Sequence, residues 1–257
     1  MNLGNIKIEE NNHIATLTID HPPANAWDWQ TMSDFEKALD DVEKNPDIFV
    51  VVLTGAGEKC FSAGFDVRDA AANGDKTSAL GRILWRRLDR FEKPVIAVIN
   101  GFALGGGLEL AMSCHFRIMA DAPAVTIGLT ELNLGIIPGW GGTQRLSRLV
   151  GKAKALNMIL FSERIDAKTA LEIGLVDKIA PPDRLMAEAL EFAKMLSERP
   201  PIAVRYVLKA FSAGVYEGVD AGLAVEDEGS AFLRTTEDRK EGFAAFLEKR
   251  KPNFTGR

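Results

Sequence analysis

Two short runs of apolar residues place the strongest limit on how this chain can fold. Residues 48–53 read Ile-Phe-Val-Val-Val-Leu and residues 95–99 read Val-Ile-Ala-Val-Ile, with no polar side chain in either run. A strand with one solvent-facing side alternates apolar and polar residues, whereas a strand covered on both faces does not. Each run is followed by a loop and then by helical sequence. These patterns predict buried strands with helices packed on them, which is an α/β fold.

The rest of the chain extends this pattern before it changes to helices alone. A hairpin is predicted for residues 6–19, and Asp28 is placed to cap a helix whose apolar face is Trp29, Met32, Phe35, Leu39 and Val42. Residues 54–65 are typical of a loop. Further strands are expected at residues 116–119, 125–127 and 175–179, and further helices at 139–150, 167–172, 201–213, 217–233 and 236–250. We therefore expect an α/β core over residues 1–197 that holds the functional site, and a helical region over residues 198–257.

Composition removes several classes of function. The net charge is -5, and the densest basic cluster is the short run 249–251, so binding to a nucleic-acid backbone is not expected. The first residues do not resemble a targeting signal. The chain also contains no run of about 18 apolar residues, which is the length needed to span a bilayer. Cys60 and Cys114 are too few for a disulfide framework, and three scattered histidines give no metal site. These features favour a cytoplasmic enzyme without a metal, nucleic-acid or membrane partner.

Two glycine-rich turns, each after a buried strand, are the strongest candidates for a functional site. Residues 60–66 read Cys-Phe-Ser-Ala-Gly-Phe-Asp, and residues 105–109 read Gly-Gly-Gly-Leu-Glu at the start of a helix. Glycine lets backbone N–H groups point outward unobstructed, and a helix N-terminus adds a positive dipole end. Two such groups aimed at one point would form an oxyanion hole. For either turn alone, close packing of a helix on a strand is the simpler explanation.

Two glutamates accompany these turns. Glu109 lies in the first turn of an otherwise apolar helix, and Glu131 lies between apolar stretches before a Gly/Pro-rich turn. A carboxyl group among apolar residues must be paired, capping or functional. Compensation of the helix dipole explains one such glutamate, but two beside two glycine turns favour acid–base chemistry.

These residues also carry a family resemblance. Segments 61–66, 93–101, 105–111, 135–146 and 238–250 resemble the enoyl-CoA hydratase/isomerase (crotonase) family, in order and over nearly the whole chain. The resemblance implies a spiral of ββα repeats with near-perpendicular sheets. It also implies a C-terminal helical region for trimer contacts, giving a homotrimer or a homohexamer built as a dimer of trimers. The substrate would be an acyl-CoA thioester, with no separate cofactor.

The resemblance assigns roles to individual positions. The N–H groups of Phe65 and Gly106 would form the oxyanion hole around the thioester oxygen. The CoA adenine would lie near the Ala63 carbonyl, Ala24 and Ala26 would border the CoA arm, and Arg68 would lie near its phosphates. The remaining substrate-binding candidates are Asp66, Val67 and Trp140, the last as a wall of the acyl pocket, although core packing would also explain a tryptophan there.

Within the family, the acids distinguish the reactions. Hydratases resemble this chain in having glutamate at both Glu109 and Glu131, so hydration of a 2-enoyl-CoA to a 3-hydroxyacyl-CoA is expected. Glu109 would activate water and Glu131 would deliver the proton, with the reverse assignment open. The competing hypotheses are an enoyl-CoA isomerase or another crotonase-type lyase acting on a cyclic or branched acyl-CoA, and a non-catalytic or RNA-binding homologue.

Overall fold

The computed structural model describes residues 1–257 and contains one large sheet. Its seven strands lie in the order β1-β2-β3-β4-β6-β8-β10. The N-terminal strands β1 (Asn2–Leu3), β2 (Ile6–Asn11) and β3 (Ile14–Ile19) pair antiparallel, and β4 (Val50–Gly55), β6 (Val95–Ile99), β8 (Phe116–Ala120) and β10 (Lys178–Ala180) continue parallel from β3. Every residue of β4 and β6 is buried. The predicted α/β class, with central strands covered on both faces, is confirmed.

A second, smaller sheet contains β5 (Cys60–Ser62), β7 (Phe102–Leu104) and β9 (Ile127–Gly128), all parallel. Three successive chain segments each give one strand to the large sheet, one to the small sheet, and then a helix. The units are β4–β5–α2 (Ala70–Asp89), β6–β7–α3 (Gly106–Ser113) and β8–β9–α4 (Gly142–Val150). This is the ββα repeat that the resemblance implied. The reading of residues 54–65 as a loop was wrong, because β5 lies within it.

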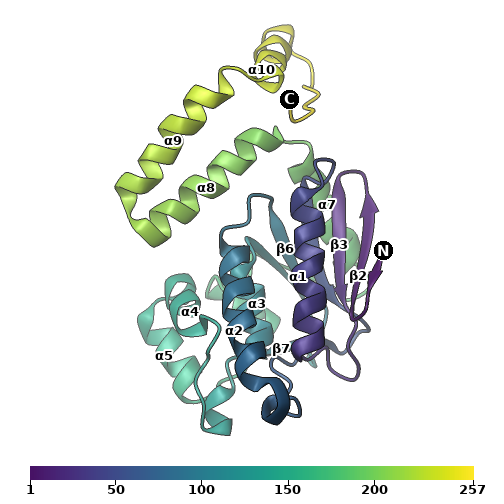
Figure 1. Ribbon diagram of the computed structural model, residues 1–257, viewed down its shortest axis with the longest axis vertical. Coiled ribbons are helices and arrows are strands. Elements are labelled where there is room, and N and C mark those ends of the chain that lie inside the picture. The colour runs from purple at the N-terminus through teal and green to yellow at the C-terminus, as the bar shows by residue number, and fades with distance from the viewer.

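Helices cover both faces of the large sheet. On one face α1 (Trp29–Lys44) packs on β1 and β2, and on the other α7 (Leu185–Ser197) packs across β3, β4, β6, β8 and β10 (Figure 1). Asp28 caps α1 as predicted, accepting a hydrogen bond from the Thr31 N–H at 2.7 Å. Trp29 was wrongly placed on the buried face of α1. It is exposed, because it begins the helix beyond the part that the core covers.

The remaining helices complete the core and then leave it. A 3₁₀ helix, η1 (Glu131–Leu134), precedes α4, and α5 (Lys152–Leu160) and α6 (Ala167–Glu172) follow it. Helices α8 (Pro201–Glu217) and α9 (Val219–Leu233) pack on each other as a hairpin beside the core, and α10 (Glu237–Glu248) follows at its end (Figure 1). None of the helices is both long and apolar enough to cross a bilayer.

Candidate active site

Glu109 lies buried in the first turn of α3, a helix in which every residue is buried. Its Oε1 accepts hydrogen bonds from two backbone N–H groups, that of Trp140 at 2.8 Å and that of Gly142 at 2.6 Å. These two donors belong to the turn that begins α4, so the start of one helix holds a carboxyl group from another. Burial and the nearby Glu131 charge nevertheless raise the pKa of Glu109 to about 7, since the two N–H groups only partly compensate.

Glu131 begins η1, and only 8% of the residue is exposed. Its Oε2 is buried without any hydrogen-bond partner. Burial raises the pKa of Glu131 to about 7. The carboxyl group lies against the turn that precedes α3, because a Cβ at Gly105 would lie 3.0 Å from Glu131 Oε1. The two acids are 22 residues apart in the sequence, yet they lie close enough for the charge of Glu131 to raise the pKa of Glu109.

The two glycine turns meet at Gly64 and Gly106. Gly64 has a φ of +85°, and a Cβ there would lie 2.7 Å from the Gly106 nitrogen. Only glycine permits this backbone angle and this close approach without strain. The next residue, Phe65, is thereby placed beside the first turn of α3.

The backbone N–H groups of Phe65 and Gly106 donate none of the hydrogen bonds formed by the residues around them. Phe65 forms a bridge with Trp27, whose two bonds run from Trp27 N–H to the Gly64 carbonyl and from Asp66 N–H to the Trp27 carbonyl. Because successive N–H groups of an extended chain point to opposite sides, the Phe65 N–H points away from this bridge. Gly106 begins α3, and the N–H groups of a first turn have no acceptor within the helix. Two adjacent backbone donors thus lie close to both acids.

The other predicted residues form a strip that leads from Gly64 to the surface. The Ala63 N–H donates to the Ala24 carbonyl at 3.0 Å, which joins the two predicted segments, and Ala26 is buried next to them. Arg68 forms a double ion pair with Asp66, at 2.6 and 2.9 Å, and this pair holds the pKa of Asp66 below its usual range. The side chains of Val67 and Arg68 are exposed, so both are available to a ligand from outside.

Trp140 belongs to a cluster of aromatic rings beside Gly106. Its ring lies 5.2 Å from Trp85 and 6.2 Å from Phe65, each in an edge-to-face arrangement. Trp85 in turn donates from Nε1 to the Gly106 carbonyl at 3.1 Å. Trp27 and Trp85 are fully buried core residues, whereas Trp29 lies outside the cluster on the surface.

Sequence reasoning missed the ion pair that holds the 139–142 turn. Arg145 donates to the Trp140 carbonyl at 2.5 Å and forms a two-bond pair with Asp89 at the end of α2. Both side chains are about one-tenth exposed. Arg145 lies inside the segment 135–146 that carries the family resemblance, which was the available signal. Nothing in the sequence indicated Asp89 as its partner.

The sequence and the fold of this chain are similar to those of known proteins. The family model described as enoyl-CoA hydratase/isomerase matches residues 9–257. The chain is 42% identical to a short-chain-enoyl-CoA hydratase of Clostridium acetobutylicum, covering 98% of this chain and 97% of the relative. It is 40% identical to a crotonyl-CoA hydratase of Syntrophomonas wolfei, covering 97% of each. An enoyl-CoA hydratase structure from Bacillus anthracis superposes with a TM-score of 0.94 at 37% identity, over 99% of this chain and all of that one.

Proposed function

The chain belongs to the enoyl-CoA hydratase/isomerase family, and we propose that Glu109 and Glu131 add water across the 2,3 double bond of a 2-enoyl-CoA. The product is the 3-hydroxyacyl-CoA. One observation carries the proposal: two buried carboxyl groups, each with its pKa raised to about 7, lie beside two free backbone N–H groups. The names of two relatives, a short-chain-enoyl-CoA hydratase and a crotonyl-CoA hydratase, support the same reaction.

The surroundings of the two acids favour different protonation states. Oε1 of Glu109 accepts two N–H bonds, which stabilise a carboxylate, whereas Oε2 of Glu131 has no donor to stabilise a negative charge. A pair of interacting acids with similar pKa values shares its protons, and the ionised member is the one whose carboxylate accepts more hydrogen bonds. Glu109 is therefore the base that activates water, and Glu131 is the acid.

The reaction starts with Glu109 ionised and Glu131 protonated. Glu109 accepts a proton from water as the water oxygen bonds to Cβ, and the double-bond electrons move through Cα onto the thioester oxygen. The Phe65 and Gly106 N–H groups hydrogen-bond this developing enolate oxygen, and the loss of one such donor costs about 3–4 kcal/mol in other enzymes. Glu131 then gives its proton to Cα. The proton gained by Glu109 and the one lost by Glu131 are exchanged with solvent, which restores both acids.

The CoA part of the substrate is assigned to the strip formed by Ala24, Ala26, Ala63, Asp66, Val67 and Arg68. Asp66 fixes the Arg68 side chain through two hydrogen bonds and leaves part of the guanidinium exposed. An exposed guanidinium suits the CoA phosphates, which accept paired hydrogen bonds. The Ala63 carbonyl is assigned to the adenine amine. No resident cofactor or metal takes part in this mechanism.

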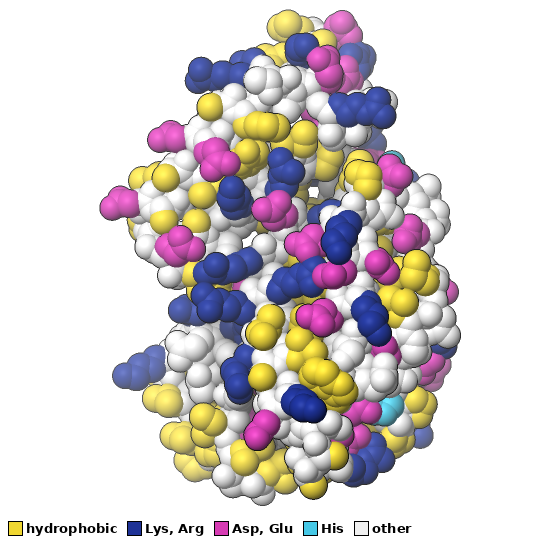
Figure 2. Space-filling model, viewed as in Figure 1, with side chains coloured by type: hydrophobic (Ala, Val, Ile, Leu, Met, Phe, Trp, Pro, Cys, Tyr) yellow, Lys and Arg dark blue, Asp and Glu magenta, His cyan; other side chains and the backbone are white.

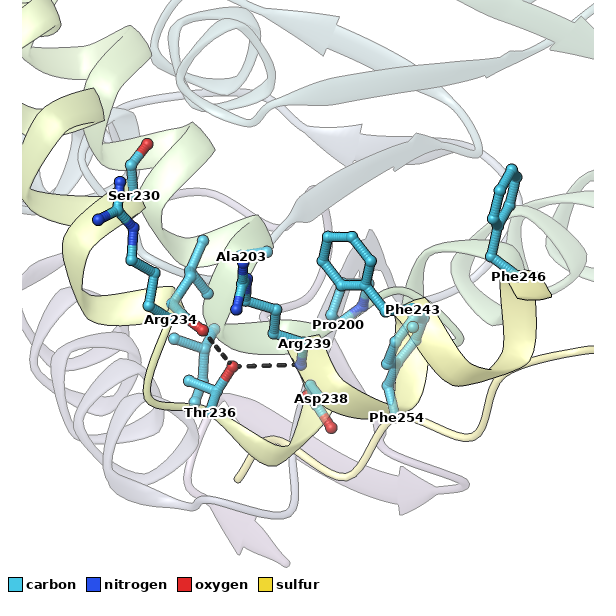
Figure 3. Close-up of a pocket in the computed structure, with 13 residues that line it drawn as sticks. Pro200, Ala203, Ser230, Arg234, Thr236, Asp238, Arg239, Phe243, Phe246 and Phe254 are labelled. Carbon is cyan, nitrogen blue, oxygen red and sulfur yellow. Dashed lines mark hydrogen bonds between the residues drawn. The ribbon is translucent and has the colours of Figure 1, made fainter. Parts of the chain in front are cut away.

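We assign the helices from α8 onward to contacts between subunits, in a trimer or a dimer of trimers. Several large apolar side chains there are exposed in the single chain: Phe211, Val219, Phe243, Phe246 and Leu247, each by 60% or more. Figure 2 shows apolar side chains on the α8–α9 hairpin and on the end of the molecule that carries α10. Figure 3 shows Phe243 and Phe254 side by side in a pocket of about 570 Å³ near Pro200, with Phe246 at its edge. Soluble monomers rarely expose large apolar patches.

We also place the protein in the cytoplasm. Cys60 and Cys114 are buried free thiols, which fits a reducing compartment.

Crotonyl-CoA tests the proposed reaction directly. The protein should remove the enoyl-thioester absorbance and, in water labelled with heavy oxygen, place the label on C3 of the product. Isomerisation of a 3-enoyl-CoA without hydration would favour the isomerase reading instead. Retention of RNA in filter binding, with no turnover of either thioester, would favour a non-catalytic homologue.

A further inference from the structure

We propose that the Trp140 indole closes the acyl end of the site, so that the enzyme takes 2-enoyl groups of crotonyl length and rejects long linear chains. This inference rests on the proposed function, because it concerns the acyl end of the same site. It names the class of substrate that this chain's own residues select.

The indole fills the space beside the proposed oxyanion donor. A Cβ at Gly106 would overlap the six-membered ring of Trp140. From another side, a Cβ at Gly81 would lie 2.6 Å from Trp140 Cε2. Glycine in the interior of a helix such as α2 is unfavourable relative to alanine, so Gly81 is explained by the room that the ring requires.

Trp140 is held rigidly in this position. Its Nε1 donates to the Ser78 carbonyl at 3.2 Å, and the rings of Trp85 and Phe65 pack edge-to-face on it. Only 5% of Trp140 is exposed. The ring cannot swing aside for a longer chain without losing these contacts, because a well-packed side chain has no free volume to enter.

The position of the ring relative to the reacting atoms makes it a wall. The thioester oxygen is assigned to the Gly106 N–H, and the activated water to Glu109, whose Oε1 is hydrogen-bonded to the Trp140 N–H at 2.8 Å. The acyl chain therefore starts between the Gly106 N–H and the Glu109 carboxyl group, and the indole occupies the volume beside Gly106.

Trp140 also lines a groove at the surface. This groove has a volume of about 620 Å³ and includes Gly139, Gly141, Arg82 and Arg86. The same ring thus contacts both the Gly106 turn and this groove. A smaller side chain at position 140 would leave space between the Gly106 turn and the groove.

A series of trans-2-enoyl-CoA substrates, from crotonyl to decenoyl, tests the inference. For the wild type, kcat/KM should fall by about 10²-fold or more along the series, since even one methylene without room is penalised about tenfold or more. Trp140→Ala should reduce the crotonyl-to-decenoyl ratio by at least about tenfold, and Trp140→Phe should lie between. The ratio is measured on one preparation, so it does not depend on how much of a variant is folded.

Phe35→Leu is the matched control. Phe35 is a fully buried ring of the same cluster, 5.2 Å from Trp27 and 6.0 Å from Trp85, and has no ring contact with Trp140. Its replacement should lower thermal stability and leave the chain-length ratio unchanged. Equal kcat/KM for crotonyl and decenoyl thioesters in the wild type, or a wild-type ratio in Trp140→Ala, would overturn the inference while leaving hydration intact. Failure to hydrate any member of the series would instead contradict the proposed function.

Discussion

The guanidinium of Arg145 donates a hydrogen bond to the carbonyl oxygen of Trp140 at 2.5 Å. Trp140 passes this restraint on, because its N–H donates to Oε1 of Glu109. Arg145 is itself held by Asp89 through two hydrogen bonds. A chain of contacts thus runs from the end of α2 through the turn before α4 to the proposed base.

Arg145→Lys should therefore reduce kcat by up to about 10²-fold, because lysine cannot form the two-pronged pair and small misplacements of a reacting group are costly. KM should change little, since the residues assigned to CoA lie elsewhere. Steady-state kinetics with crotonyl-CoA provide the measurement. Lys240→Met is the control: it breaks the exposed pair with Glu237, and should leave kcat unchanged and cost at most about 1 kcal/mol. Normal kcat in Arg145→Lys would show that the turn holds Glu109 without this side chain.

Glu109→Gln and Glu131→Gln should each lower kcat by at least about 10²-fold, as expected for a lost acid–base group. The double variant should lose much less than the product of the two single losses, because both residues act on one addition of water. Glutamine preserves the volume of each side chain, so thermal melting should remain cooperative. Near-normal turnover in either single variant would remove that residue from the mechanism.

The same two carboxyls should make stability depend on pH. In the folded chain both keep their protons up to about pH 7, whereas an ordinary glutamate loses its proton near pH 4.5. Between these values the folded state binds more protons than the unfolded state, so the free energy of unfolding must fall as pH rises through this window. The Glu109→Gln, Glu131→Gln double variant lacks this contribution.

Urea unfolding between about pH 5 and about pH 8 measures the effect. The free energy of unfolding of the double variant minus that of the wild type should increase with pH, by a few kcal/mol in all. This difference should level off above about pH 7. Other titrating groups, including buried His115, are common to both proteins and cancel in the difference. Parallel curves for the two proteins would show that the glutamates have ordinary pKa values.

The proposed oxyanion hole depends on backbone groups, which leads to a contrast between adjacent residues. Phe65→Ala keeps the N–H and should change kcat by less than about tenfold, or about 1.4 kcal/mol. Gly64→Ala should abolish most activity, because its Cβ would meet the Gly106 nitrogen and the Leu104 carbonyl oxygen at 2.7 Å.

Gly57→Ala separates this clash from simple backbone strain. Gly57 has a similar positive φ of 79°, but a Cβ there would meet nothing within 4 Å. This variant should lose about 1–2 kcal/mol of stability and keep its turnover. A thousandfold loss in Phe65→Ala with normal melting would instead mean that the ring takes part in the chemistry.

Elements with a clear local pattern were predictable from the sequence, and several others were not. The bounds of β6 at Val95–Ile99 and of α6 at Ala167–Glu172 agree with the prediction, because runs of β-branched residues and helical spacing are local signals. β5 and β7 have three residues each, too few to show a period, and α5 was missed after Gly151.

In the predicted site, too, residues with a local sequence signal were found, and contacts between distant segments were not. Glu109 and Glu131 were found as charged residues in apolar surroundings, a local contrast that one sequence reveals. The pairing of Asp89 with Arg145 spans 56 residues and depends on how α2 packs near α4, so no local pattern indicated it. The room for Trp140 depends on two glycines far apart in the chain, Gly81 and Gly106.

The exposed side chains from α8 onward predict that the protein is an oligomer in solution. Phe211 and Phe246 are 75% and 81% exposed in the single chain, so water alone would cover them in a monomer. Light scattering should give three or six times the mass of one chain. The substitutions Phe211→Arg and Phe246→Arg should shift the protein toward smaller species, because a buried arginine without a partner is costly. Within one chain these surface changes should cost no more than about 0.5 kcal/mol, so a folded, dissociated protein is the expected result. A wild-type mass equal to one chain at micromolar concentration would rule out the assembly, and these helices would then have to tolerate an exposed apolar surface.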